Sequence, residues 1–360
     1  MIECRYEIMH GDRKVAWIDS HGHCEIFQEK FMPYHLYLED ADTDIDTLVN
    51  NITNFYYWCA TRVLTLDRQY AKEILNSIGA SQAMTDKDRA QIALSYHCLS
   101  LTDIYWVKKS EEDITYGEIN LYENHLDNAF VSVALRGKQM TVQNKSLVRD
   151  LSTNGCFPKS WIRTENGFSL LKDGGADVVE REVLASKICQ CFDCQQVNYR
   201  EEYFDGEKVS VSDIMTSKEQ SIVSRADFEI YACNQEINAL DYILKLDAYS
   251  YYMMNILDYL VGNTDRHWGN WGFWIDNKTN ETVCLHPLMD FNQTFHSYET
   301  IEGANCQTIG TKIMTQKEAA VEAVRQIGLN QLEEIKEVWF QGRKKEYEMF
   351  TKRLELLRKS

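Results

Sequence analysis

The sequence has little proline and little positive charge for its length. Only three prolines occur in 360 residues, and neither a low-complexity linker nor an internal repeat divides the chain. Domain boundaries must therefore be read from changes in the pattern of polar and apolar residues. Acidic residues outnumber basic ones, 55 to 38, which gives a formal net charge of −17. This charge argues against direct nucleic-acid binding over an extended surface, which needs clustered Lys and Arg.

The sequence also lacks a long apolar run. No segment has the length of a membrane-spanning helix, and the N-terminus MIECRYEIMHGDRK is charged where a secretory signal needs an apolar core. We therefore predict a cytoplasmic protein with no membrane partner and with free thiols. Cys189, Cys191 and Cys194 have metal-ligand spacing, but no second CxxC or HxxxH accompanies them. The helical pattern around them favours burial as small apolar side chains.

The apolar content is high enough for a folded protein. Hydrophobic residues make up 44% of the chain, which suffices for one large core or two modest ones. Residues 1–40 alternate polar and apolar side chains and predict strands. Residues 43–97 change to helical spacing, and Thr85 with Asp88 predicts a capping box at the start of one helix.

From Leu151 onward the order of the elements becomes informative. A polar loop is followed by a strand, a tight turn at 165–167 and a second strand that ends at Lys172. The sequence ADVVEREVLASKICQCF that follows predicts a helix, with Asp177 as its N-cap and Glu180 as the capping partner.

A second hairpin and a long helix follow. The hairpin turns at 205–206, and its second strand leads through Ile214 into a polar connector. A helix with one apolar face then stops at Gly262. The final helix is expected to dock onto the core through side chains at heptad spacing. These are Tyr347, Phe350, Leu354 and Leu357.

Polar side chains crowd the stretch LVGNTDRHWGNWGFW that follows the long helix. Two β-prone runs around a turn come next. If that hairpin is centred near Asn280, Trp271 lies opposite Asp290, and Asn270 and Asp290 meet at its open end. An amide oxygen and a carboxylate would then coordinate one divalent cation beside Asp265. The alternative is a polar helix end followed by an ordinary hairpin.

The spacing of these residues is typical of protein kinases. There, an aspartate orients the attacking hydroxyl, an asparagine five residues later binds magnesium, and an aspartate beyond a hairpin binds it too. Upstream, candidates for four further kinase features appear in the order that kinases have them. They are a phosphate loop at 152–155, a strand lysine at Lys172, a helix glutamate at Glu182 and a hinge in the connector after Ile214. Glu182 is favoured over Glu180 as the partner of the lysine, because the helix cap uses Glu180.

With these residues assembled, the chain resembles the HipA-like serine/threonine kinases, the toxin half of bacterial toxin–antitoxin pairs. In DRHWGN, Arg266 and His267 follow the aspartate as supporting residues, as they also do in phosphoinositide kinases. LMDFNQTF resembles a DFG segment with Asn292 in place of glycine, and STNGCFPK resembles the family's phosphate loop. The resemblance covers residues 150–295.

The resemblance implies a role for each site residue. Asp265 and Lys172 are the implied catalytic residues, and Asn270 and Asp290 bind Mg²⁺. The implied ATP-binding residues are Ser152, Thr153, Asn154, Gly155, Lys159, Lys172, Glu182 and Met215. Ser152 is also the candidate for autophosphorylation, with Thr153 as an adjacent competitor.

The implied fold is α+β and two-lobed, with a β-rich N-lobe and a mainly helical C-lobe. The expected parts are an N-terminal subdomain at 1–145, the kinase N-lobe at 146–216 and the C-lobe at 217–360. The implied activity is ATP-dependent phosphorylation of a protein Ser or Thr hydroxyl with Mg²⁺, and the implied partner is a small DNA-binding antitoxin.

Two other functions stay open at this point. A phosphoinositide-type lipid kinase shares the DRH motif, although this acidic chain shows no basic or apolar membrane-facing patch. A degenerate kinase that acts only as a binding module is the second, although none of the proposed phosphate or metal residues is missing.

Overall fold

The computed structural model describes most of the chain, in seven ranges. They are 5–40, 44–64, 68–77, 85–123, 157–165, 167–310 and 312–360. The chain divides into two compact units. Unit 1 comprises Met1–Lys172, Ile214–Ile222 and Ile275–Thr282, and unit 2 comprises Asp173–Asp213, Val223–Trp274 and Val283–Ser360. The sequence predicts three parts, at 1–145, 146–216 and 217–360. This finer division stays a prediction.

Unit 1 contains an antiparallel sheet near its N-terminus. Its strands lie in the order β3-β2-β1-β4. They are β1 (Arg5–His10), β2 (Arg13–Asp19), β3 (Cys24–Ile26) and β4 (Tyr105–Lys109). A short 3-10 helix, η1 (Glu29–Phe31), follows β3. The strands predicted within residues 1–40 are confirmed.

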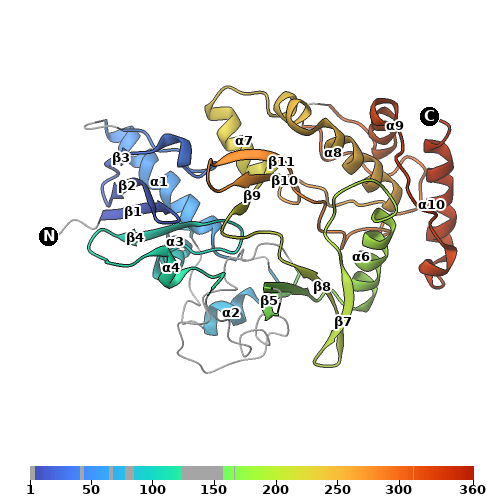
Figure 1. Ribbon diagram of the computed structural model, residues 1–360, viewed down its shortest axis with the longest axis horizontal. Helices are drawn as coiled ribbons and strands as arrows, with labels where there is room; N and C mark the ends of the chain where they lie inside the picture. The colour runs from blue at the N-terminus through green and yellow to red at the C-terminus, as the bar shows by residue number, and fades with distance from the viewer. Residues whose placement is uncertain are drawn as a thin grey trace. The chain divides into compact units, whose positions relative to one another are not determined.

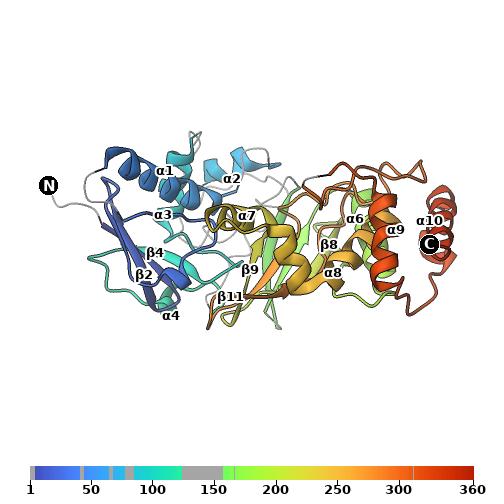
Figure 2. The ribbon, with the colours of Figure 1, turned by 90° about the horizontal axis from the view of Figure 1, so that it is seen from above.

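Four helices contribute side chains to the core of unit 1. They are α1 (Ile45–Thr61), α2 (Ala71–Ser77), α3 (Asp86–Ser95) and α4 (Tyr116–Ile119). Helix α1 lies along one face of the sheet (Figure 2) and places Phe55 and Trp58 in the same buried cluster as Ile8. Helical spacing over residues 43–97 is confirmed, as is the Thr85–Asp88 capping box.

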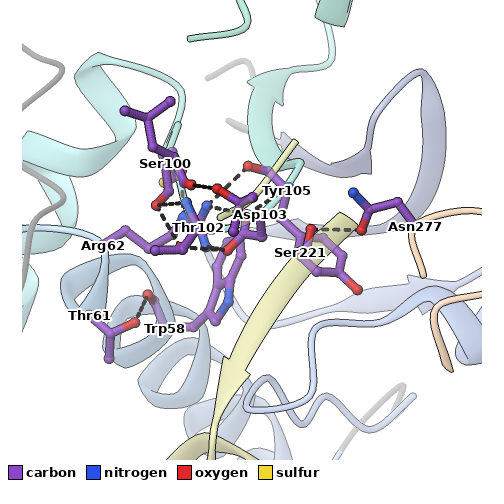
Figure 3. Close-up of polar contacts among 12 residues, drawn as sticks. Trp58, Thr61, Arg62, Ser100, Thr102, Asp103, Tyr105, Ser221 and Asn277 are labelled. Atoms are coloured by element: carbon purple, nitrogen blue, oxygen red, sulfur yellow. Dashed lines mark hydrogen bonds and ion pairs between the residues drawn. The ribbon is translucent and has the colours of Figure 1, made fainter. Parts of the chain in front are cut away.

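A buried ion pair joins the end of α1 to the start of β4. The Nη1 and Nη2 atoms of Arg62 donate to the two carboxylate oxygens of Asp103 at 2.9 and 2.7 Å (Figure 3). Nη2 also donates to the carbonyl oxygen of Tyr105. Burial alone would raise the pKa of Asp103, but the Arg62 charge outweighs it and lowers that pKa. The pair therefore stays ionised and fixes the helix against the sheet.

The predicted connector is held by a side chain of a distant turn. Asn277 donates from Nδ2 to the carbonyl oxygen of Lys218 at 3.0 Å, and its Oδ1 accepts from the Ser221 hydroxyl at 2.6 Å (Figure 3). The Thr216 hydroxyl donates to the Leu101 carbonyl oxygen. The segment that contains Met215 is therefore fixed within unit 1 by contacts on both of its sides.

Two hairpins and a three-stranded sheet complete the strands. Strand β5 (Lys159–Thr164) pairs with β6 (Gly167–Lys172), and β7 (Arg200–Phe204) pairs with β8 (Glu207–Asp213). Strands β9 (Gln220–Ser224), β10 (Gly272–Asp276) and β11 (Glu281–Leu285) form a sheet in the order β11-β10-β9. Asp205 and Gly206 have positive φ, as a two-residue hairpin turn requires. Both predicted turns are confirmed.

Unit 2 is mainly helical. Its helices are α6 (Ala176–Cys189), α7 (Arg225–Asn234), α8 (Ala239–Val261), α9 (Gln316–Ile327), the 3-10 helix η3 (Glu337–Phe340) and α10 (Lys344–Leu357). Helices α8 and α9 pack side by side, and α10 lies next to both (Figure 1). Phe350, Leu354 and Leu357 of α10 are buried. The predicted docking of the final helix is therefore confirmed.

The predicted capping of α6 is wrong. The N-cap is Gly175, at φ 83°, and no side chain caps the helix. Asp177 instead pairs with Arg343 at 2.6 Å, and Glu180 pairs with Lys208 at 2.8 Å. Glu180 is therefore used by the β8 lysine rather than by the helix end.

The long helix α8 ends where the sequence predicts. Gly262 is its C-cap in the left-handed conformation, at φ 62° and ψ 44°. A Cβ atom at this position would lie 2.3 Å from a ring carbon of Tyr298. Both the backbone conformation and the close packing therefore require glycine just before the polar loop.

We expect Gly262→Ala to reduce the free energy of unfolding by about 2–4 kcal/mol, because left-handed strain adds to overpacking against Tyr298. Urea denaturation measures the loss. The same substitution at Gly206, where nothing lies within 4 Å of an added Cβ, separates strain from clash. Equal losses in the two variants would contradict the packing argument.

Candidate active site

A buried arginine organises the loop between α8 and β10. The side chain of Arg266 is 2% exposed. Its Nε and Nη2 atoms donate to Oδ2 and Oδ1 of Asp258 at 2.9 and 3.1 Å. Its Nη1 atom donates to the carbonyl oxygens of Asn270 and Met289 at 2.8 and 2.6 Å. One guanidinium therefore joins the end of α8, the polar loop and the segment before Asp290.

The bidentate geometry explains why this position takes arginine. A planar guanidinium matches the two oxygens of Asp258 and still has a donor for each carbonyl. The guanidinium carbon of Arg266 also lies 5.6 Å from the centre of the buried Phe291 ring. Removing either charged partner would leave an unpaired buried charge, which is strongly destabilising.

Asp265 lies half-buried in the loop, before its turn at 268–269. Its backbone N–H donates to Oδ1 of Asn263 at 3.1 Å, and Asn263 donates in turn to Asp258. Burial raises the pKa of the Asp265 carboxyl; the charge of His267 opposes this rise, and that of Asp290 adds to it. A raised pKa makes this carboxylate a better proton acceptor.

Asn270 is oriented by the same loop. Its Nδ2 atom donates to the Asp265 carbonyl oxygen at 2.9 Å, and its backbone N–H donates to the His267 carbonyl oxygen. Because Nδ2 of Asn270 donates to this carbonyl oxygen, its Oδ1 atom points away from the Asp265 backbone. An amide oxygen is a ligand that magnesium accepts.

Asp290 is held in an unusual backbone conformation, at φ 60°. Its backbone N–H donates to the Tyr199 hydroxyl at 3.0 Å. Asn292 donates from Nδ2 to Oδ1 of Asp290 at 2.5 Å. Neighbours on both sides therefore maintain a conformation that non-glycine residues seldom adopt.

The predicted register of the hairpin is wrong. The backbone N–H of His286 donates to the Gly272 carbonyl oxygen at 3.0 Å, so Trp271 is not opposite Asp290. The turn closes from Asp276 to Asn280, which is earlier than predicted. Arg266 joins the segments that carry Asn270 and Asp290, through the carbonyl oxygens of Asn270 and Met289.

Asn270 and Asp290 offer oxygen atoms of the kind that magnesium accepts as ligands. No cluster of three or more His, Cys, Asp or Glu side chains suited to a metal occurs in the part of the chain that the structure describes. Magnesium at nucleotide sites takes only one or two carboxylates, with phosphate and water as further ligands. The buried Oδ1 of Asn292 lacks a hydrogen-bond donor among the described residues, which suits a site completed by a ligand.

The other predicted residues that the structure describes belong to both units. The phosphate-loop residues 152–155 lie outside the described residues. Lys159 and Lys172 are buried at the start of β5 and at the end of β6, and Met215 is partly buried in the connector, all in unit 1. Glu182 is buried on α6 in unit 2, where Ser210 donates to it. The Lys172–Glu182 ion pair stays a prediction.

Two of the three clustered cysteines are buried and the third, Cys194, is partly buried. Cys189 and Cys191 are buried. The thiol of Cys194 is directed toward the Cys189 carbonyl oxygen. Their interpretation as small apolar side chains is confirmed for Cys189 and Cys191.

Sequence reasoning missed three supporting residues. Asp258 could have been found, because it is a carboxylate within the apolar part of a helix and eight residues before an arginine. Asn263 sits in the crowded loop and gave no distinct signal. Tyr199 is distant in sequence and became visible only in the fold.

Comparison with known proteins supports the fold. No family model and no curated protein sequence matches this chain. Among solved structures, HipA of Shewanella oneidensis MR-1, determined with HipB and operator DNA, matches with a TM-score of 0.55. That match covers 98% of this chain and 90% of HipA at 11% identity. The Helicobacter pylori proinflammatory kinase CtkA matches with a TM-score of 0.41 and 14% identity, over 54% of this chain and 89% of CtkA.

The HipA match defines an α+β protein with a kinase-like fold. More particularly, the chain shares the fold of HipA, as the sequence resemblance predicted. Within the described residues, no helix is both long and apolar enough to span a membrane.

We expect stability to fall in mild acid because of His286. Its burial, together with the Arg266 charge, lowers the pKa of this imidazole to about 4, although the Pro287 carbonyl opposes the shift. Between pH 6.5 and 4 the unfolded chain therefore binds a proton that the folded chain does not. Lowering the pH through this range thus lowers the free energy of unfolding. The His286 share is about 3 kcal/mol. Urea denaturation at several pH values should show that the free energy of unfolding falls less in acid for His286→Gln than for the parent. The same dependence on pH in both proteins would contradict this.

Proposed function

We propose that the chain is an ATP-dependent protein serine/threonine kinase. The observation that carries the proposal is the arrangement around Arg266. This one buried side chain holds the loop of Asp265 and Asn270 beside the segment that leads to Asp290. Kinases need these three residue types for the hydroxyl and the metal. The HipA fold supports the same interpretation.

Asp265 would orient the attacking hydroxyl and accept its proton. It lies half-buried, with its backbone fixed through Asn263, and its pKa is raised by burial. These properties suit a carboxylate that must be held in place and must take a proton as the hydroxyl attacks phosphorus. The γ-phosphoryl group then passes from ATP to the hydroxyl oxygen, and ADP leaves.

Asn270 and Asp290 would hold magnesium, which neutralises phosphate charge during the transfer. In this proposal Lys172 and Lys159 contact phosphate, residues 152–155 form the phosphate loop, and Met215 lies at the hinge. Ser152 remains the candidate for autophosphorylation.

A partner protein is part of the proposal. The S. oneidensis HipA structure also contains HipB and operator DNA. We propose a small DNA-binding antitoxin as the partner of this chain, with the antitoxin rather than this acidic chain contacting DNA. The cysteines of the described residues are free thiols, which suits the proposed cytoplasmic location.

Incubation with γ-labelled ATP and Mg²⁺ tests the proposal. We expect the parent chain to label serine or threonine in itself or in casein. Asp265→Asn should fold, bind nucleotide and transfer at least about 100-fold less label, because the oriented carboxylate is lost. Asp241→Asn, at the exposed start of α8, is the matched control and should retain activity.

Each rival function has its own outcome in this assay. Nucleotide binding without label transfer by the parent chain would support a binding module. Label appearing in phosphatidylinositol vesicles but not in protein would support a lipid kinase. Parent-like activity of Asp265→Asn would refute the catalytic assignment.

A further inference from the structure

Asn292 occupies a position that the proposed mechanism does not use. It follows Asp290 by two residues and is 6% exposed. The residue between them, Phe291, is fully buried and packs against Tyr199 with ring centres 6.1 Å apart. The Phe291 carbonyl oxygen accepts from both the N–H and the hydroxyl of Thr294. Asn292 therefore belongs to a fixed turn, which determines where its side chain can reach.

The amide nitrogen of Asn292 controls the Asp290 carboxylate. Nδ2 donates to Oδ1 of Asp290 at 2.5 Å. The opposite orientation of the amide would place its oxygen against a carboxylate oxygen, so the chemistry of the pair selects the observed one. A charge-assisted bond of this kind restricts rotation of the carboxylate. Asp290 is thereby held in one orientation before any cation binds.

The amide oxygen of Asn292 has an unmet requirement. It is buried, and no donor among the described residues reaches it. Leaving a buried acceptor without a donor costs about 1–3 kcal/mol. Such an atom beside a metal-binding carboxylate is explained if a ligand supplies the donor. Magnesium keeps several waters in nucleotide sites, and those waters are hydrogen-bond donors.

We infer that Asn292 is a positioning residue of the metal site: Nδ2 fixes the Asp290 carboxylate, and Oδ1 accepts a hydrogen bond from a water bound to the metal. This inference rests on the proposed function. It also gives a physical reason for asparagine at this position, because a glycine could make neither contact. Partners of this kind, one step removed from the metal, commonly change metal affinity 10–100-fold.

Thermal unfolding with a non-hydrolysable ATP analogue tests the inference without relying on activity. The rise in Tm is measured across a Mg²⁺ titration, and the Mg²⁺ concentration that gives half the rise is compared between variants. For Asn292→Ala we expect this concentration to increase at least about tenfold. With EDTA in place of Mg²⁺, the effect of the analogue should equal that in the parent.

Asn255→Ala is the matched control. Asn255 is equally buried, at 5% exposed, and accepts from the Thr308 hydroxyl at 2.7 Å within unit 2. We expect it to lower the baseline Tm and to leave the half-rise Mg²⁺ concentration within about twofold of the parent, as a loss confined to stability would. A tenfold increase in the control as well would overturn the inference, because the effect would then reflect general destabilisation.

The remaining outcomes are distinct. If Asn292→Ala keeps the parent's half-rise Mg²⁺ concentration, Asn292 only stabilises the turn and the inference is wrong, while the proposed function stands. If the parent shows no Mg²⁺-dependent rise, the proposed function and the inference both fail. Should Asn292→Ala not fold, Asn292→Ser applies the same criterion, since its hydroxyl is too short to reach Asp290.

Discussion

The salt bridge between Asp258 and Arg266 determines the path of the chain through the candidate active site. Both side chains are almost fully buried, and the four hydrogen bonds of the guanidinium offset the cost of burying the pair. Two of those bonds go to backbone carbonyls on separate segments. The positions of Asp265, Asn270 and Asp290 follow from them. A site that needs three polar groups at fixed distances is thus supported by one interaction behind it.

Unit 1 uses a similar device. Arg62 at the end of α1 pairs with Asp103 and also reaches a backbone carbonyl of β4. In both units an arginine near a helix end makes a bidentate contact with a buried aspartate. The same arginine also donates a hydrogen bond to a backbone carbonyl oxygen. Such pairs add little net stability compared with apolar packing, but they specify one arrangement of the segments they join.

Local features can be predicted from the sequence where a backbone conformation strongly favours one residue type, as the left-handed conformation favours glycine. Gly262 ends α8 as expected, and the turns at 165–167 and 205–206 follow from glycine and its neighbours. The kinase-like fold could also be predicted, because residue types recur in a fixed order.

Partners that are distant along the chain could not be predicted. The hairpin register failed because turn length depends on backbone bonds that the polar residues near Asn280 leave undetermined. The sequence predicts a helix cap for Glu180, because its actual partner, Lys208, is distant in sequence. The contact of Tyr199 with Asp290 is equally invisible without the fold.

Replacing Arg266 by lysine tests whether this side chain sets the geometry of the candidate active site. Lysine keeps the positive charge beside Asp258 but lacks the fork that reaches both carbonyls. Rates of label transfer from γ-labelled ATP are to be compared for parent and variant, with circular dichroism as the check on folding. We predict a folded variant with turnover reduced at least about 100-fold, because the segments that carry Asn270 and Met289 lose the side chain that joins them. Turnover at the parent's rate in Arg266→Lys, or no turnover in the parent, would contradict the account.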